Sequence, residues 1–233
     1  MTILVGIDDT DVLGARGTNH LARALAAQVA ERWHCSRILR HQLLVDPRIP
    51  FTSHNGSASL AFEPQDGSGA DALREEIRRG MLADFIDGSD PGLCVATRVP
   101  PEVVVFGQRC RREVVSADEA RAVARENGLH LEGLGGTEGG VIGALAAVGL
   151  AATGDHGRVV MNGKWNVDLT GIVSVREVLA RGVDAVIEAA TGYEVGDGTV
   201  DLLKKLRPNR RAGQTVLFVE RAPDGTWRAL RRD

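Results

Sequence analysis

The sequence predicts an α+β fold, and three observations support this. Apolar patterns through residue 99 follow the order strand, helix, strand, strand, helix, strand, which is typical of a split-βαβ or ferredoxin-like element. A Gly-rich loop and a small-residue helix follow at residues 133–150. A polar break at residues 153–157 then precedes a stretch with several short strand patterns. We therefore expect two mixed α/β domains, residues 1–155 and residues 156–233.

The composition indicates a globular protein with an aliphatic core. Hydrophobic residues make up 43% of the 233 residues, charged residues 25% and aromatic residues 4%, which is ordinary for a folded domain apart from the few aromatics. The net charge of −3 argues against a strong sequence-independent grip on nucleic acid. The three cysteines lack metal-type spacing. With neither a signal-peptide pattern nor a long apolar run, we expect a cytoplasmic protein without membrane contact.

The first part of the chain alternates strand and helix patterns. Residues 2–7 form an apolar run of strand length, and residues 18–33 carry apolar residues at helical spacing, with Thr18 at the N-cap position. Further strands are predicted at 38–45, 57–62 and 93–99, with a charged helix at 70–85. The loop at 46–56 is long enough to be functional.

The later elements are read in the same way. A short helix is expected at 101–112, and the capping box from Ser116 to Glu119 starts a helix that ends near residue 127. A short strand is expected at 129–134, and the small-residue helix follows the Gly-rich loop. Beyond the break, the patterns predict strands at 158–161, 215–221 and 227–230, a loop at 162–168 and a helix at 173–181.

Three aspartates at the end of the first strand are the most informative feature. Asp8, Asp9 and Asp11 fall within four residues, and burying uncompensated carboxylates costs several kcal/mol each. Hard oxygen ligands that leave room for phosphate oxygens suit Mg²⁺. The alternative is that one aspartate caps the helix, one makes a turn and one is solvated.

The Gly-rich loop is a candidate anion site. Backbone N–H groups at such a loop and at the following helix N-terminus bind phosphate, and we expect contact from Gly135, Gly136, Thr137 and Gly139. The alternative is that the small-residue helix only packs tightly against a sheet. A later loop with Arg207, Arg210 and Arg211 is either a phosphate contact or a solvated turn.

Several stretches together resemble the archaeal agmatidine synthetases that modify an isoleucine tRNA. The matching segments are Gly6–Asp11 followed by Gly17–Thr18, Asn55–Gly56, Val141–Gly149, Gly163–Val175 and Thr191–Val219. The resemblance implies a kinase-like domain next to a ferredoxin-like domain, with ATP and Mg²⁺ as cofactors. It also implies that Asp8, Asp9 and Asp11 hold the metal and the ATP phosphates, and that Thr18 contacts or accepts a phosphoryl group.

Other residues are expected at the margin of this site. Arg16, Gly17 and His20 flank the aspartates in the sequence, and Asn55 and Gly56 end the long loop. His54 either reaches over the same pocket or is an exposed loop histidine.

The implied activity is that of an ATP- and Mg²⁺-dependent phosphotransferase or activating enzyme with an unknown phosphoryl acceptor. The chain has no Cys-x-x-Cys pair, which the zinc ribbon of the tRNA-modifying family would require. The acceptor is therefore either a small molecule, such as an amine or a cofactor precursor, or a tRNA presented by a partner chain. The alternative is a non-catalytic nucleotide-binding regulatory subunit. The sequence is also compatible with a homo-oligomer.

Overall fold

The N-terminal part of the chain forms the predicted ferredoxin-like element. The computed structural model describes residues 1–49, 51, 54–163 and 169–232. The elements are β1 (Ile3–Asp8), α1 (Thr18–Gln28), β2 (Trp33–Gln42), β3 (Gly56–Pro64), α2 (Ala70–Ala83) and β4 (Gly92–Ala96). The strand order is β4-β1-β3-β2, and every neighbouring pair is antiparallel. The predicted βαββαβ order and the α+β class are thus confirmed.

Side chains along β1 alternate between the two faces of the sheet, and each face packs against a different layer. Three fully buried residues join the core beneath α1 and α2: Ile3, Val5 and Ile7. Because side chains along a strand point to opposite faces, the intervening residues face the other layer. There Gly6 lies against the backbone of Ala144, and Asp8 lies against Gly143. The strand period therefore directs Asp8 toward the helix that contains Gly143.

That second layer is helical. Its helices are α3 (Pro101–Arg109), α4 (Ala117–Glu126) and α5 (Val141–Ala152), while β5 (His130–Gly133) joins the sheet beside β4. The capping box of Ser116 and Glu119 is confirmed at the start of α4. Helix α5 is apolar on all sides and buried between the sheet and α3, as expected for an internal helix. It has 12 residues, and no helix in the described part of the chain has the length and apolar character needed to cross a membrane.

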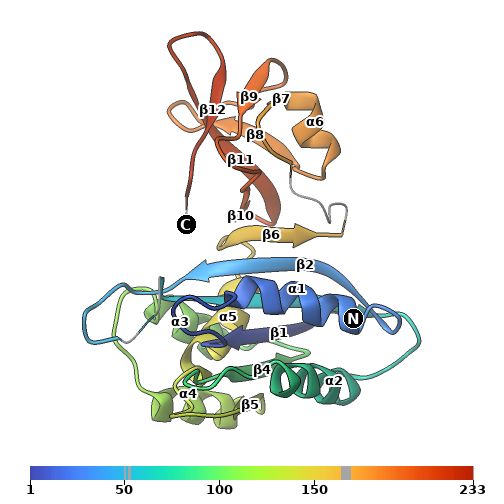
Figure 1. The fold of residues 1–233 in the computed structure, drawn as a ribbon, viewed down its shortest axis with the longest axis vertical. Coiled ribbons are helices and arrows are strands. Elements are labelled where there is room, and N and C mark those ends of the chain that lie inside the picture. Colours follow the sequence, from blue (N-terminus) through green and yellow to red (C-terminus); the bar gives the residue numbers. More distant parts are fainter. Residues whose placement is uncertain (50, 52–53, 164–168, 233) are drawn as a thin grey trace.

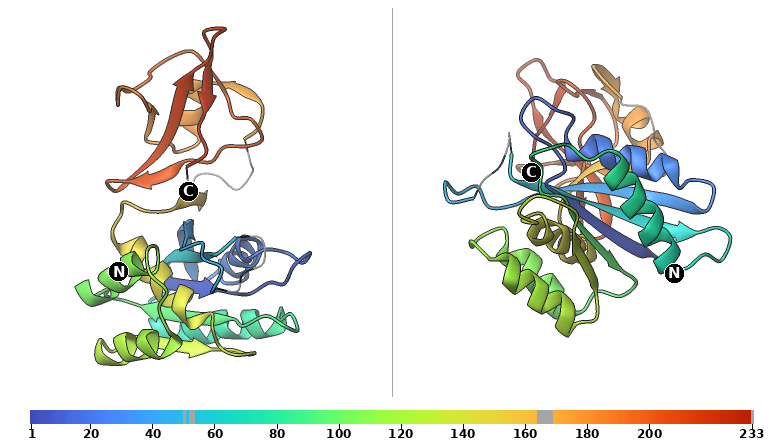
Figure 2. Two further views of the ribbon diagram at one scale, coloured as in Figure 1. Left: turned by 90° about the vertical axis from the view of Figure 1, so that its left-hand side faces the viewer. Right: turned by 60° about the horizontal axis from the view of Figure 1, so that its bottom comes forward.

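The C-terminal part extends the same sheet. Its elements are β6 (Arg158–Asn162), β7 (Ile172–Ser174), α6 (Val175–Ala180), β8 (Ala185–Glu188), β9 (Thr199–Asp201), β10 (Asn209–Arg211), β11 (Gln214–Arg221) and β12 (Trp227–Ala229). Strand β6 pairs with β2 on one side and with β10 on the other. Figures 1 and 2 show β6 between the lower ferredoxin-like layers and the upper C-terminal part. The upper part has its own core of Val and Leu residues. The division into residues 1–155 and 156–233 stays a prediction.

Some element boundaries differ from the expectations. The helix predicted at 18–33 ends at Gln28, and Trp33 instead begins β2 and is buried in the core. Trp33 follows Val29 at helical spacing, so periodicity could not separate the two elements. The helix predicted at 173–181 starts later than expected, because Ile172–Ser174 form β7 and the helix α6 spans Val175–Ala180. Strands β8 and β10 were not predicted, and the loop predicted at 162–168 lies mostly outside the described residues.

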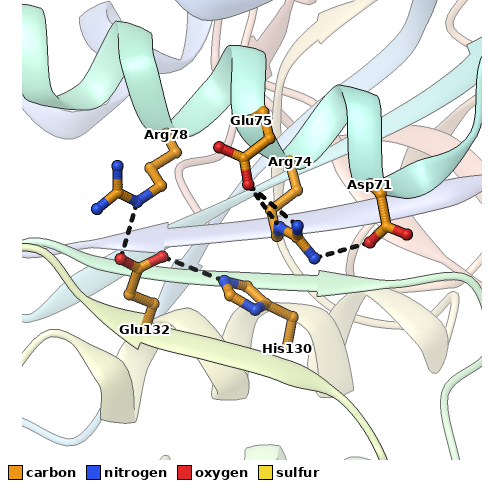
Figure 3. Close-up of polar contacts among 6 residues, drawn as sticks. All are labelled: Asp71, Arg74, Glu75, Arg78, His130 and Glu132. Atoms are coloured by element: carbon orange, nitrogen blue, oxygen red, sulfur yellow. Dashed lines mark hydrogen bonds and ion pairs between the residues drawn. The ribbon is translucent and has the colours of Figure 1, made fainter.

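Charged side chains connect α2 to the outer strand of the lower sheet. Arg78 Nε lies 2.8 Å from Glu132 Oε1 of β5, and His130 Nε2 lies 3.3 Å from Glu132 Oε2 (Figure 3). Arg74 pairs with Asp71 at 2.7 Å and with Glu75 at 3.0 Å on α2 itself. These side chains are partly exposed, so each pair contributes only about 0 to 1 kcal/mol.

Candidate active site

A cavity lies at the end of β1 and collects most of the residues predicted from the sequence. It contains about 850 Å³ of empty space, part of it open to solvent, which is within the size range of small-molecule sites. Its polar lining comprises Asp8, Asp9, Asp11, Thr18, His54, Asn55, Asp90, Glu113 and Thr137. Its remaining lining comprises Leu43, Ile49, Phe51, Gly56, Cys110, Val115, Gly139, Gly140, Ile142 and Gly143.

The antiparallel register explains why distant segments meet here. Ile7 of β1 pairs with Ala58 of β3, and Asp8 pairs with Gly92 of β4. The starts of β3 and β4 therefore lie beside the end of β1. This brings the predicted Gly56 and the unpredicted Asp90 to the aspartates.

The Asp8 carboxylate is held against the first turn of α5. A Cβ atom on Gly143 would lie 1.7 Å from Asp8 Oδ2, so only glycine leaves room for the carboxylate. Burial raises the pKa of Asp8 to about 7, and the nearby Asp9 charge contributes to this rise. The helix N-terminus next to Asp8 supplies backbone N–H groups that favour negative charge.

Asp9 occupies a left-handed backbone conformation, with φ of 50°. This is uncommon for a residue other than glycine and is often found at functional sites. Its carbonyl oxygen accepts a hydrogen bond from the Asp90 N–H at 3.1 Å. Burial raises the pKa of Asp9 to about 6, with further contributions from the Asp90 and Asp11 charges. Asp90 is thus a fourth carboxylate of the site.

Asp11 and Thr18 close the other side of the cavity. Burial raises the pKa of Asp11, and the Arg16 charge opposes this rise. Thr18 is a buried residue in the first turn of α1, where its Oγ1 accepts a hydrogen bond from Thr10 Oγ1 at 3.2 Å. The prediction of Thr18 as N-cap was wrong, because Gly17 is the N-cap and no side chain caps the helix.

Two of the four residues predicted in the Gly-rich loop line the cavity. Thr137 and Gly139 line the cavity, and Thr137 donates to both oxygens of Asp90, at 2.6 Å from its N–H and 2.6 Å from its Oγ1. Gly135 lies against the ring of Phe85, and Gly136 lies behind the Asp90 carboxylate. Neither lines the cavity.

Three other predicted residues lie outside the cavity wall. Arg16 donates from Nη2 to the carbonyl oxygen of Asp84 at 2.6 Å and also pairs with the Asp84 carboxylate. Gly17 lines a neighbouring pocket, and His20 is exposed beside another. Arg16 also donates from Nη1 to the carbonyl oxygen of Thr10 at 3.5 Å, so it supports the backbone between Asp9 and Asp11 and places a positive charge near Asp11.

The donor chemistry of the site fits Mg²⁺. Asp8, Asp9, Asp11 and Asp90 offer only oxygen atoms, which Mg²⁺ prefers. Within the described ranges, no three His, Cys, Asp or Glu side chains converge closely enough to hold an ion by themselves. Mg²⁺ usually binds through one or two carboxylates together with water and substrate phosphates. The site thus fits a metal ion that arrives with a nucleotide.

A buried histidine pair lies at the junction between β2 and the start of the C-terminal part. His41 Nδ1 and His156 Nδ1 are 3.0 Å apart, and His41 Nε2 lies 2.8 Å from Ser59 Oγ. A single proton between the two Nδ1 atoms satisfies both rings, whereas protonating both rings places two N–H groups face to face. Burial lowers the pKa of His41 well below its usual value and lowers that of His156 to about 4.

This pair predicts a loss of stability in mild acid. Unfolded histidine has a pKa near 6.5, so the unfolded chain takes up protons first as the pH falls. The neutral pair stabilises the fold fully above pH ~6.5, and this stabilisation is lost as the pH falls to ~4. The free energy of unfolding that is lost through His156 amounts to about 3 kcal/mol. Urea unfolding at a series of pH values should show a steeper acid loss for the wild type than for His156→Asn. Parallel curves would contradict the prediction.

Comparison with known proteins identifies relatives for about two thirds of the chain. No family model matches. A 2-agmatinylcytidine synthetase (TiaS) that acts on an isoleucine tRNA in Pyrobaculum neutrophilum is 30% identical over 154 residues, which are 64% of this chain and 35% of the relative. The corresponding enzyme of Methanopyrus kandleri is 29% identical over 170 residues, 68% of this chain and 36% of the relative. An uncharacterized protein of Methanocaldococcus jannaschii is 28% identical over 156 residues, 64% of this chain and 50% of the relative.

Solved structures support the same relationship. The crystal structure of a tRNA fluorescent labeling enzyme superposes with a TM-score of 0.55 at 26% identity, covering 64% of this chain and 36% of that one. The complex of TiaS with its isoleucine tRNA, AMPCPP and agmatine gives a TM-score of 0.54 at 25% identity, with the same coverage. This chain spans about a third to a half of the length of the curated relatives it matches. The predicted resemblance is confirmed: about two thirds of the chain is related to part of the 2-agmatinylcytidine synthetases that act on isoleucine tRNA.

Proposed function

We propose that this protein is an ATP- and Mg²⁺-dependent phosphotransferase or activating enzyme that uses the cavity at the end of β1. The observation that carries the proposal is the meeting of Asp8, Asp9 and Asp11 with Thr18 and the N-terminus of α5 in one cavity. Among the relatives, TiaS is known in a complex with AMPCPP, an ATP analogue, together with agmatine and an isoleucine tRNA. Phosphoryl transfer depends mainly on positioned phosphates and charge stabilisation, and these are the two properties that the cavity offers.

Each group has a role in this proposal. Asp8 and Asp9 would hold Mg²⁺ together with the ATP phosphates, and the metal would offset the charge of both. The backbone at Gly139 and the N-terminus of α5 would bind phosphate oxygens. Thr18 would contact the transferred phosphoryl group or carry it transiently. The acceptor is either a small molecule or a tRNA presented by a partner chain.

Phosphorylation of Thr18 gives a direct test. After incubation with Mg²⁺ and ATP, we expect one phosphoryl group to appear on the Thr18 peptide by mass spectrometry, with ADP as the product released. AMP would form only if a second phosphate were cleaved and released as inorganic phosphate. Thr18→Ala should abolish the label and reduce turnover. Thr97→Ala is the matched control, since Thr97 is exposed and lies outside the cavity.

Two other outcomes have definite meanings. If ATP binds but no product forms, with or without added acceptors, the protein is a nucleotide-binding regulatory subunit and not an enzyme. Saturating a site with ligand at 100 times its dissociation constant stabilises a fold by about 2.7 kcal/mol. A thermal unfolding midpoint unchanged by saturating Mg-ATP would therefore contradict nucleotide binding altogether.

A further inference from the structure

A second cavity adjoins the aspartate site and has the opposite charge. The two cavities share four residues: Asp11, Thr18, His54 and Gly56. The remaining lining of the second cavity comprises Gly17, Asn19, Arg40, Arg158, Arg207 and Arg231. We call this cavity the arginine pocket. Among the described residues that line the pocket, four are arginines and one, Asp11, carries a carboxylate.

The sheet itself brings these arginines together. Arg40 of β2 and Arg158 of β6 are directly opposite each other in the antiparallel pair. The Val159 N–H donates to the Pro208 carbonyl at 2.8 Å, which places the neighbouring Arg207 beside β6. Arg231 follows β12 at the end of the described chain. Four separate segments thus supply positive charge to one place.

Two of these arginines carry donors that no other described residue uses. The Arg207 Nε atom is buried and has no hydrogen-bond partner among the described residues. Neither Arg207 nor Arg231 forms an ion pair or side-chain hydrogen bond with another described residue. A buried donor without a partner costs about 1 to 3 kcal/mol, and a bound oxyanion would remove this cost.

The position of Arg40 connects the pocket to the aspartate site. A Cβ atom on Gly56 would lie 3.1 Å from Arg40 Nη2, so the guanidinium packs directly on a residue that both cavities share. A ligand that binds in the arginine pocket would lie next to Thr18. A cationic amine would be repelled there, whereas a phosphate would find planar donors suited to two-pronged binding.

We propose that the arginine pocket binds the phosphate group of a small phosphorylated compound, the second ligand of the ATP site. The four arginines line a cavity rather than an extended surface, which favours a compact anion over a long polyanion. The role as second ligand rests on the proposed function, whereas anion binding by the pocket does not.

Calorimetric titration can separate these claims. We expect inorganic phosphate and glycerol 3-phosphate each to bind one site on protein already saturated with Mg²⁺ and AMPCPP. Arg207→Gln and Arg231→Gln should each weaken phosphate binding by about tenfold or more, the effect of losing one charge-assisted hydrogen bond. Both variants should keep their AMPCPP affinity within about twofold, comparable to the experimental spread.

Matched controls make the result specific. Arg228→Gln removes an exposed arginine of β12 that pairs only loosely with Glu220, at 4.0 Å, and should leave phosphate binding unchanged. Circular dichroism checks the fold of each variant. Arg231 is exposed, so Arg231→Gln still tests the pocket if Arg207→Gln fails to fold.

The remaining outcomes are equally informative. Phosphate that competes with AMPCPP would overturn the proposal, because the arginines would then hold the nucleotide's own phosphates. Absent phosphate binding, or binding unaffected by both variants, would also overturn it. If a single-stranded RNA oligonucleotide binds far more tightly than phosphate, with steep salt dependence, the ligand of the pocket is nucleic acid and not a small compound. Phosphate binding sensitive to Arg231→Gln without AMPCPP binding would support the anion site and reject the proposed function.

Discussion

Replacing Asp8 by asparagine is expected to abolish ATP turnover and to stabilise the fold at the same time. Asparagine keeps the shape of the side chain next to Gly143 but removes the charge that would hold Mg²⁺ and phosphate. Loss of one positioned electrostatic group at an active site typically costs about a hundredfold or more in rate. We therefore expect turnover to fall by at least that factor, measured as ADP or AMP release.

The expected gain in stability follows from the raised pKa. Asp8 titrates near pH 7 in the folded protein rather than near 3.8, so protonation favours the folded state. The stabilising effect of the protonated form is complete below pH ~4 and is lost as the pH rises through ~7. At pH 8 the neutral asparagine should recover on the order of 2 to 4 kcal/mol, which raises the unfolding midpoint by about 5 °C or more.

The combined readout separates a functional aspartate from a structural one. Asp87→Asn is the control, because Asp87 is exposed in the same region of the fold and does not line the cavity. It should change neither turnover nor stability. An Asp8→Asn protein that loses both activity and stability would mean that Asp8 holds the structure together, and one that keeps its activity would remove Asp8 from the site.

Gly6→Ala is expected to cause a large loss of stability through a single added methyl group. The added Cβ would lie 2.0 Å from the carbonyl oxygen of Ala144, and a rigid helix backbone cannot move locally to relieve this clash. Inserting one extra carbon into a packed core typically costs about 1 to 3 kcal/mol, and contact with backbone places this change at about 3 kcal/mol or more.

The same substitution should also impair the site at a distance. Pushing α5 away from β1 would move Gly143 from Asp8 and the helix N-terminus from the cavity. Urea unfolding measures the stability, and Mg-ATP binding measures the site. Gly196→Ala is the control, because nothing lies within 4 Å of a Cβ added there. Equal stability of the two variants would show that β1 and α5 are less tightly apposed than the structure indicates.

The ferredoxin-like core could be predicted because its signals are local and consistent. Alternating and helical apolar periods defined βαββαβ, and the capping box at Ser116 marked the start of α4. The end of α1 could not be placed, since Trp33 fits both a helical and a strand pattern and only the tertiary core decides between them. Strand β10 reads Asn-Arg-Arg, which lacks the apolar residues typical of strands. It forms because β6 and β11 pair with it on both sides.

The site was predictable where residues are adjacent in the sequence. Asp8, Asp9 and Asp11 stand together, and they line one cavity in the structure. Asp90 was missed because its loop carries only turn signals. The predicted strand order could have found it, since the start of β4 must lie beside the end of β1. Arg207 was considered as a phosphate contact, but its meeting with Arg40 and Arg158 could not be foreseen, because it depends on the register between β2 and β6, which are far apart in the sequence.

The shared strand β6 has a consequence for how the two halves of the chain depend on each other. It covers the outer edge of β2 with backbone hydrogen bonds, while its other edge pairs with β10. A fragment that ended before residue 158 would expose the edge of β2, and unprotected strand edges promote aggregation. A fragment that began at β6 would expose the edge of β6 that pairs with β2 in the whole chain, and that edge would also promote aggregation. Each half thus acts as the solubilising cover of the other.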